Sequence, residues 1–543
     1  MKKALTVLLA LVLVFSLFSC AKTTEGGTSA PTSSAPTDTA SAQPASAGPE
    51  TAAPESAAPE KEYGGVLKIV NTSEGAAPLG IPWEIYSLDS YLIKPCGEGL
   101  VVSKADGEYV GLLATGWTAD INEPSVTFQL RKGVKFTDGS DFNAEVVKWN
   151  CEKAQEDNML DTNIISMEVI DDYTIKFGLE EWSFQILTSF ERAMISKEAF
   201  EANGIEWARE NPVMTGPFKL KQYDRGVKLV YERNENYWQE GKPYLDGVEY
   251  HFISDTMTQN AAMQATGDQR VDVLNTTSPE QVLALQGLDV YVLSMDSGSL
   301  NLIPNSLDPD SPFNDIRVRQ AISYAIDRDA IMAARGFGVM SPANQLLPES
   351  VMGRLPDSYN CTYDLEKARQ LMAEAGYADG FSTAIYCMPG IVDVDIAVAI
   401  QSMLEKINVR VAVETPDQGG YSALRFGEWD GMLFQLLRLF PGVINTMALN
   451  FDVQDDLTTN WLKSAYRPLE ELYNAYQDAA RQEAVSDEKL QVCHRLLLEN
   501  MCCVPVYNIS DYYIVRNNVH DTGFTVWSAN TVWMPADAWM SQD

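Results

Sequence analysis

The chain has 543 residues, 45% of them apolar, and a formal net charge of −35 at pH 7. This length and apolar content allow large hydrophobic cores and predict more than one compact unit. The strongly acidic balance argues against a nucleic-acid partner, because phosphate binding needs a basic face.

The N-terminus is typical of a bacterial secretion signal. Lys2 and Lys3 precede an apolar run from Ala4 to Phe18 that is too short for a comfortable membrane span. Leu17-Phe18-Ser19-Cys20 then resembles a lipobox, in which Cys20 is acylated and becomes the mature N-terminus. Phe18 is bulkier than the usual residue there, so ordinary cleavage remains an alternative. We therefore expect residues 1–20 to be a lipoprotein signal peptide and Cys20 to be the lipidation site.

Residues 21–62 consist mainly of Ala, Ser, Thr, Pro, Glu and Gly, with no aromatic residue. Such a segment buries too little surface to offset its ordering entropy, so it is predicted to be a disordered tether. As a flexible coil of about 40 residues it would average roughly 35 Å end to end. After residue 20, no stretch approaches the roughly 20 apolar residues that a membrane span requires.

Strands and helices are predicted from Gly64 onward. Gly64–Thr72 is apolar on both faces, which indicates a buried strand. Leu130–Asn150 begins as the end of an alternating strand with Val126, Phe128 and Leu130 on one face. A turn at Gly133, a second short strand with Val134 and Phe136, and a helix capped by Asn143 follow. The helix that starts at Val318 is expected to continue through Ile331 with a core-facing apolar side. Its charged residues Arg317, Arg319, Asp327 and Arg328 are expected on the outer face.

Further elements follow from alternation and turn signals. Up to residue 306 they are a hairpin within Val169–Leu179 and strands at Val227–Arg233, Val248–Asp255, Val271–Thr276, Tyr291–Met295 and Leu300–Ser306. A helix capped by Asp364 and closed by Gly376 comes next. It is followed by a strand at Phe381–Met388, a helix at Val394–Lys406, a strand at Val409–Glu414, helices near Leu469–Arg481 and Asp487–Asn500, and a strand at Met501–Asn508. The β-α-β alternation after Phe381 predicts a parallel-rich sheet covered by helices.

Cysteine and histidine give no sign of a catalytic or metal site. Seven cysteines besides Cys20 lack C-x-x-C spacing, so buried free thiols are predicted, with one or two disulfides as the alternative. The three histidines lie far apart in sequence, which argues against a metal site. Sequence signatures of zinc proteases, serine hydrolases and nucleotide-binding loops are also absent. The sequence therefore predicts no enzyme activity, no metal and no cofactor.

Six motifs in order carry a family resemblance. They are GLLATGWTAD (Gly111–Asp120), LRKGVKFTDG (Leu130–Gly139), TGPFKL (Thr215–Leu220), RNENYW (Arg233–Trp238), VRQAISYAIDRDAI (Val318–Ile331) and YDLEKARQLMAEAGY (Tyr363–Tyr377). Together they resemble the family 5 extracellular solute-binding proteins, the peptide- and nickel-binding receptors of bacterial ABC importers. The resemblance covers the chain from about Tyr63 to its C-terminus.

The resemblance implies an α/β fold of the type II periplasmic-binding-protein kind, with two lobes of mixed sheet covered by helices and joined by a hinge. Lobe I would comprise residues 63–304 with an inserted subdomain at about 97–205, lobe II residues 305–500, and residues 501–543 a return to lobe I. The hinges are expected near Asn305–Phe313 and Asn500–Val504. The ligand would lie in the cleft between the lobes.

Carried over by position, the expected ligand contacts are Trp83, Glu84, Tyr386, Trp429 and Arg438. For each aromatic residue, core packing is an equal alternative. Peptide receptors of the family place an acid, which pairs with the peptide's amino group, where Leu439 aligns here. Arg438 lies beside it and favours a carboxylate or another anion, although it is also compatible with a surface or core ion pair.

The implied function is capture of a solute, most simply a short peptide, for delivery to ABC permease subunits. The protein would act as a monomer outside the cytoplasm, lipid-anchored to the outer face of the cell membrane. A carbohydrate, an anionic metabolite or an N-blocked peptide remain alternative ligands. A sensory or adhesive surface protein, or a secreted hydrolase, are the alternative functions.

Overall fold

The computed structural model describes residues 60–438, apart from 76–77, 86, 105–107, 307, 350, 389–391 and 426–428, and residues 470–541, apart from 483–484, 528–529 and 533–534. Cys20, the signal peptide and nearly all of the expected tether lie outside these ranges. Within them, no helix is both long and apolar enough to cross a membrane.

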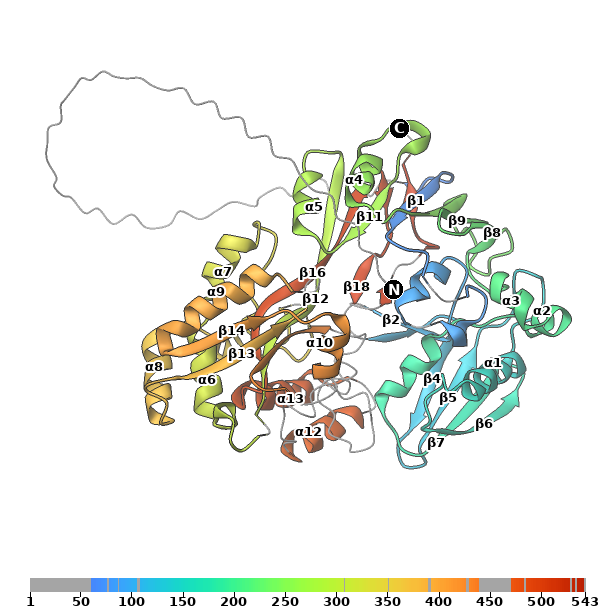
Figure 1. Ribbon diagram of the computed structural model, residues 1–543. Coiled ribbons are helices and arrows are strands. Elements are labelled where there is room, and N and C mark those ends of the chain that lie inside the picture. Colours follow the sequence, from blue (N-terminus) through green and yellow to red (C-terminus); the bar gives the residue numbers. More distant parts are fainter. Residues whose placement is uncertain are drawn as a thin grey trace, which may run out of the picture. The chain divides into compact units, whose positions relative to one another are not determined.

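A ten-stranded mixed sheet organises the described chain (Figure 1). In spatial order its strands are β14 (Val409–Glu414), β13 (Phe381–Cys387), β15 (Met432–Arg438), β12 (Val290–Pro304), β16 (Val504–Arg516), β11 (Val273–Thr276), β1 (Val66–Asn71), β10 (Gly247–Phe252), β9 (Lys228–Arg233) and β8 (Phe218–Asp224). β1 lies between β10 and β11 and is parallel to both, which confirms the prediction of a buried strand. β13 is parallel to β14 and β15, as the β-α-β alternation predicted.

Two long strands connect the two ends of this sheet. β12 pairs with β15 through Gly298–Pro304 and with β16 along most of its length, while the later part of β16 pairs with β11. The prediction of two separate strands, Tyr291–Met295 and Leu300–Ser306, was wrong. Asp296 and Ser297 lie between the two predicted strands, but the strand continues through a register shift at that point. The expected hinge stretches directly follow β12 and directly precede β16.

A separate antiparallel sheet contains β4 (Ala114–Asp120), β5 (Ser125–Leu130), β7 (Thr174–Leu179) and β6 (Ile164–Asp171), in that order. The predicted inward face of β5 is confirmed, since Val126, Phe128 and Leu130 are all buried. The side chain of Asn143 accepts a hydrogen bond from the Val146 amide (3.1 Å) and caps α1 (Ala144–Glu156), as predicted. The short strand expected at Val134–Phe136 does not form, because only the single bridge Lys135–Asp141 is present there.

The remaining strands form short two-stranded sheets. They are β2 (Val101–Ser103) with β3 (Tyr109–Gly111), β17 (Val519–His520) with β20 (Trp539–Met540), and β18 (Thr525–Trp527) with β19 (Asn530–Val532).

The described α-helices flank these sheets. After α1 they are α2 (Lys197–Asn203), α3 (Ile205–Glu210), α4 (Thr256–Gln264), α5 (Pro279–Ala284), α6 (Ile316–Ala325), α7 (Arg328–Arg335), α8 (Leu365–Glu374), α9 (Val394–Leu404), α10 (Gln418–Arg425), α12 (Glu470–Ala480) and α13 (Asp487–Glu499). The 3-10 turns are η1 (Pro82–Glu84), η2 (Ser87–Ile93), η3 (Phe184–Glu191), η4 (Gly267–Gln269), η5 (Pro312–Asn314), η6 (Asp357–Tyr359) and η7 (Glu405–Ile407).

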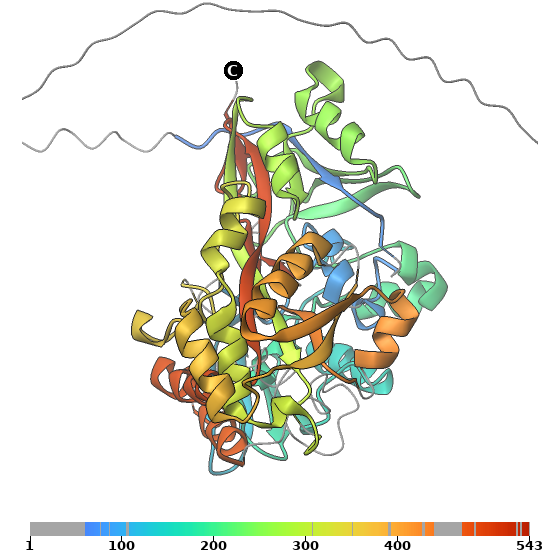
Figure 2. The same cartoon turned by 60° about the vertical axis from the view of Figure 1, so that its left-hand side comes forward.

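The single helix predicted from Val318 to Ile331 is two helices, α6 and α7, which lie alongside β16 (Figure 2). Asp327 interrupts the helix because its side chain accepts a hydrogen bond from the Ala330 amide (2.9 Å) and caps α7. Arg328 is not on an outer face. It is 3% exposed and its Nε donates to the Pro505 carbonyl at the start of β16 (2.8 Å).

Four hydrophobic cores hold the described chain together. The first surrounds the rings of Trp83, Phe128 and Phe177, and the second surrounds Ile322, Ile385 and Phe434. The third contains Tyr421, Trp429 and Leu490, and the fourth contains Val70, Met263 and Leu274. The seven cysteines within the described residues form no disulfide with one another, as predicted, and six of them are buried.

Several of the sequence motifs meet at one buried carboxylate, that of Glu98. It accepts hydrogen bonds from Thr215 Oγ1 (2.9 Å), Tyr237 Oη (2.7 Å) and Trp238 Nε1 (2.9 Å). Arg131 lies over the Trp238 ring, 4.8 Å from its centroid. Motifs that are far apart in sequence therefore serve to build one packed site within the first core.

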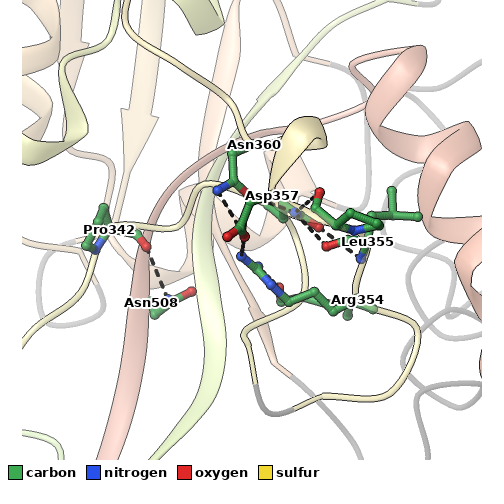
Figure 3. A network of polar contacts seen from close by, with 9 residues as sticks. Pro342, Arg354, Leu355, Asp357, Asn360 and Asn508 are labelled. Carbon is green, nitrogen blue, oxygen red and sulfur yellow. Dashed lines mark hydrogen bonds and ion pairs between the residues drawn. The ribbon is translucent and has the colours of Figure 1, made fainter. Parts of the chain in front are cut away.

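A polar network fixes the irregular segment between α7 and α8 (Figure 3). Buried Gln345 donates through Nε2 to the Leu355 carbonyl (3.0 Å) and to Asn360 Oδ1 (2.7 Å). Asn508 of β16 donates through Nδ2 to the Pro342 carbonyl (3.3 Å) at the start of the same segment. The network thereby holds the segment against β16.

Candidate functional site

A cavity of about 470 Å³ lies where strand ends from opposite sides of the large sheet meet β16. The carboxyl end of β11 reaches it from one side, and the carboxyl end of β15 from the other. Its lining comprises residues 277–280 at the start of α5, Arg335, Phe337 and Met340 in and after α7, Val392 and Asp393 before α9, Leu436 and Arg438 of β15, and residues 507–510 and Tyr512 of β16. Ligands of open α/β folds commonly bind at the carboxyl ends of strands in this way.

Arg335 and Asp393 form the best-defined ion pair of this cavity. Nε and Nη2 of Arg335 both donate to Asp393 Oδ2, at 2.9 and 2.7 Å. The hydrogen bonds to Asp393 raise the pKa of Arg335. Because Asp393 Oδ1 also accepts from the Asp395 amide and so caps α9, the guanidinium is anchored to a helix start.

Arg438 brings a second guanidinium to the cavity from the end of β15. Its Nη1 is 3.9 Å from Oδ2 of Asp511 on β16. Burial raises the pKa of Asp511, while a hydrogen bond from Ser297 and the charge of Arg438 oppose that shift. The Arg438 side chain remains about one-third exposed, so it faces both a buried acid and the cavity.

Apolar and hydroxyl groups complete the lining. Phe337 is 40% exposed, and the Arg335 guanidinium lies 5.9 Å from its ring centroid. Ser278 Oγ donates to Glu280 Oε2 (2.9 Å), which places a second carboxylate at the start of α5. Guanidinium, carboxylate and apolar surfaces thus face one space, which suits recognition of a polar solute by hydrogen bonds and charge.

The two residues predicted in the loop after the first strand lie in η1. Trp83 is 3% exposed and packs against Trp149 and Phe200, with ring centroids 6.0 and 6.2 Å apart. Glu84 accepts from Nε (2.8 Å) and Nη2 (2.7 Å) of Arg209, in α3. These contacts account for Trp83 as a core residue and for Glu84 as a salt-bridge partner.

The three later residues belong to the other side of the large sheet. Trp429 is 3% exposed and its Nε1 donates to the Ile303 carbonyl (3.3 Å), within the third core. Tyr386, on β13, is half-buried and packs against the same core, and burial raises its pKa. Of the five predicted ligand contacts, the structure places only Arg438 at the described cavity. Leu439 lies outside the described residues.

Sequence reasoning missed Arg335, Asp393 and Glu280. Asp393 carries one local signal, since an acid directly before an apolar helix is typical of an N-cap. Nothing local predicts that Arg335, 58 residues earlier, would pair with it. Within the described ranges, no group of three or more His, Cys, Asp or Glu side chains is arranged to hold a metal ion.

Known proteins are similar to this chain in sequence and in fold. Residues 108–455 match the family of bacterial extracellular solute-binding proteins, family 5. The glutathione-binding protein GsiB of Salmonella choleraesuis is 33% identical over 310 residues, which are 55% of this chain and 59% of that protein. GsiB of Shigella flexneri is 28% identical over 476 residues, 81% of this chain and 89% of that protein. The structure of HbpA2 from Haemophilus parasuis has a TM-score of 0.75 at 22% identity and covers 88% of this chain and all of that chain.

The family match defines the class as the extracellular solute-binding proteins, which are not enzymes, and the likeness to HbpA2 supports the fold. The chain belongs to family 5 of that class. The mixed α/β fold and the family predicted from the six motifs are therefore confirmed, as is the prediction that the protein is not an enzyme.

Proposed function

We propose that this chain is the substrate-binding component of an ABC importer and that its solute is a short peptide that carries both a positive and a negative charge. Membership of family 5 and the likeness to proteins named for glutathione binding support the proposal. Glutathione is itself a tripeptide with an ammonium and two carboxylates. After capture the solute would pass to membrane permease subunits.

The lining of the 470 Å³ cavity is the observation that carries the peptide assignment. It presents Arg335 and Arg438 together with Asp393 and Glu280, so positive and negative groups face one space. A zwitterionic solute can place its carboxylate at Arg438 and its ammonium at Glu280, whereas a solute of one charge can use only one of these two groups. Arg438 is the residue that we assign to a ligand carboxylate, because a guanidinium binds that group in a bidentate manner.

The same proposal covers placement and motion. The protein would have two lobes, one of residues 63–304 with 501–543 and the other of residues 305–500. They would close on the solute by bending at the connection after β12 and at the connection before β16. Acylation of Cys20 would anchor the protein to the outer face of the cell membrane, since two or more acyl chains hold a protein there durably. The folded part would act as a monomer.

An anionic metabolite is the second candidate, because Arg438 stands beside the position where peptide receptors of the family keep an acid. Calorimetric titration separates the candidates. The ligands are glutathione, dipeptides and tripeptides with free termini, their N-acetylated forms, simple dicarboxylates and sugars. Free-terminus peptides should bind, and Arg438→Gln should weaken them about tenfold or more through loss of a charge-assisted hydrogen bond.

Arg317→Gln is the matched control, because Arg317 forms an exposed pair with Asp315 and lies outside the cavity lining. Its affinity for peptides should equal that of the unmodified protein. Binding of dicarboxylates or sugars without peptides would overturn the peptide assignment. An equal loss of peptide affinity in Arg438→Gln and Arg317→Gln would overturn the role of Arg438.

A further inference from the structure

A second cavity, of about 300 Å³, lies within the first core region and outside the proposed solute site. It is lined by residues of η1, η2, η3 and β2 and by Met159, which follows α1. Its polar lining consists of Ser90, Lys94, Ser103, Thr188, Glu191 and Arg192. Neither the family match nor the likeness to GsiB assigns a role to it.

Lys94 is the central cation of this cavity. Its side chain lines both this space and a smaller adjoining cavity of about 50 Å³. Within the described residues, the Lys94 ammonium has no hydrogen bond and no ion pair. Burial lowers the pKa of Lys94, and the charge of Glu191 opposes the shift. A cation held in this way gains free energy when an anion enters the cavity.

Arg192 places a second cation on the wall. Its Nη1 donates to the Pro82 carbonyl (2.6 Å) and its Nη2 to the Met159 carbonyl (2.8 Å), which fixes the guanidinium. Its Nε is buried and has no hydrogen-bond partner. Buried donors without an acceptor are uncommon in proteins. The Arg192 Nε–H is therefore, after the Lys94 ammonium, a second donor at this cavity without an acceptor.

Glu191 is the one acid among the lining residues that the structure describes, and part of its capacity to accept hydrogen bonds is used. Its Oε1 accepts a hydrogen bond from the Ser103 amide (2.6 Å). Two cations and one anion give the described part of the lining a net charge of about +1. The rest of the wall includes Ile85, Ile93, Val102 and Met159, which offer an apolar surface to the remainder of a ligand.

We propose that this cavity is a binding site for a small monocarboxylate with an apolar body. Its carboxylate pairs with Lys94 and Arg192, and its apolar part packs on the isoleucine, valine and methionine side chains. This site would let the protein respond to a second metabolite while the cavity at Arg438 holds the transported solute. A purely structural role for Arg192 explains its two carbonyl contacts but leaves the lone ammonium of Lys94 without a function.

Calorimetric titration of the full mature protein with isovalerate tests the proposal, with isovaleramide as the neutral ligand of the same size. Isovalerate should bind at about millimolar strength, as expected for so small a ligand, and the amide should not. Lys94→Met should weaken isovalerate about tenfold or more, because it removes the charge-assisted contact. Lys104→Met, at a surface residue paired with Glu108, should bind as the unmodified protein does.

Arg438→Gln separates this site from the proposed solute site. It should retain isovalerate binding, and Lys94→Met should retain peptide binding. The proposal is overturned if isovalerate does not bind up to about 10 mM, if the amide or inorganic phosphate binds equally well, or if Lys94→Met leaves the affinity unchanged.

A labelling experiment on the unmodified protein covers the case in which Lys94→Met does not fold. Lysine acetylation is followed residue by residue by mass spectrometry, with and without isovalerate. Protection of Lys94 but not of Lys104 supports the site. Equal labelling of Lys94 in both samples overturns it.

Discussion

At the scale of single residues, Glu98 shows how burial changes the pKa of a carboxyl group. Burial raises its pKa to about 7, although hydrogen bonds from Tyr237, Trp238 and Thr215 and the charge of Arg131 oppose that shift. The sequence motifs supply three donors and a nearby cation to this one carboxylate. The desolvation cost nevertheless exceeds their contribution, which is why the pKa remains above its ordinary value.

A defined pH dependence of stability follows from Glu98. The folded pKa lies above the unfolded value of 4.5, so the folded state binds more protons and stability falls as pH rises from about 4.5 to about 7. A shift of this size corresponds to roughly 3 kcal/mol. Urea unfolding at pH 5 and pH 8 should show that Glu98→Gln loses less stability over this interval than the unmodified protein.

Glu108→Gln is the control for that measurement, since Glu108 is an exposed partner of Lys104. It should follow the unmodified protein at both pH values. If Glu98→Gln keeps the full pH dependence, the carboxylate of Glu98 is not the group that titrates.

At the scale of elements, capping decided where helices begin, and local sequence was sufficient to predict this. Asn143 and Asp364 cap α1 and α8 as expected, and Gly376 has the positive φ of +86° that a left-handed C-cap position needs. The α6–α7 break was missed because the apolar residues on both sides keep one helical period, which hid the competing cap at Asp327.

Arg328 shows what that break achieves. In addition to its bond to Pro505, its Nη1 donates to the Ser323 carbonyl (3.2 Å) and its Nη2 to the Ser323 hydroxyl (3.1 Å). Arg328→Met would remove these hydrogen bonds to buried acceptors and should lower the free energy of unfolding by about 3 kcal/mol or more. Chemical denaturation measures the change.

Arg317→Met provides the comparison for Arg328, because Arg317 makes an exposed pair on the same pair of helices. The Arg317→Met substitution should lower the free energy of unfolding by no more than about 1 kcal/mol. Similar costs for the two substitutions would contradict the anchoring role of Arg328.

At the scale of the whole described molecule, β12 and β16 join cores that lie on different parts of the sheet. Leu300 and Leu302 of β12 pack in the second core, while Val515 of β16 packs in the first and Ile514 in the fourth. One strand cannot leave its sheet without exposing side chains of more than one core. The cores are therefore expected to unfold together.

Calorimetric unfolding tests this coupling with one substitution in each of two cores. Phe128→Ala in the first core and Phe434→Ala in the second each remove a fully buried ring and should cost about 3–5 kcal/mol. Both variants should show a single transition at a lower temperature than the unmodified protein. A transition that splits in two for either variant would show that the cores unfold independently.

The sequence by itself determined what depends on neighbours along the chain. Strand faces such as that of β5, the caps of α1 and α8, the parallel arrangement of β13 and β14, and family membership through six motifs were all predicted, because periodicity, caps and short motifs act over a few residues. The continuous strand β12 and the helix break at Asp327 were predicted incorrectly, since pairing partners and competing caps outweighed local pattern there.

Only the tertiary structure decided which side chains share a cavity. Trp83 and Trp429 have the residue type of a binding site but lie in cores, whereas Arg335, Asp393 and Arg438 converge from three separate segments. Lys94 and Arg192 meet in the same way across 98 positions, and nothing near either residue in sequence indicates it. Such sites depend on long-range strand order and packing, because the groups that desolvate and pair a charge come from distant parts of the chain.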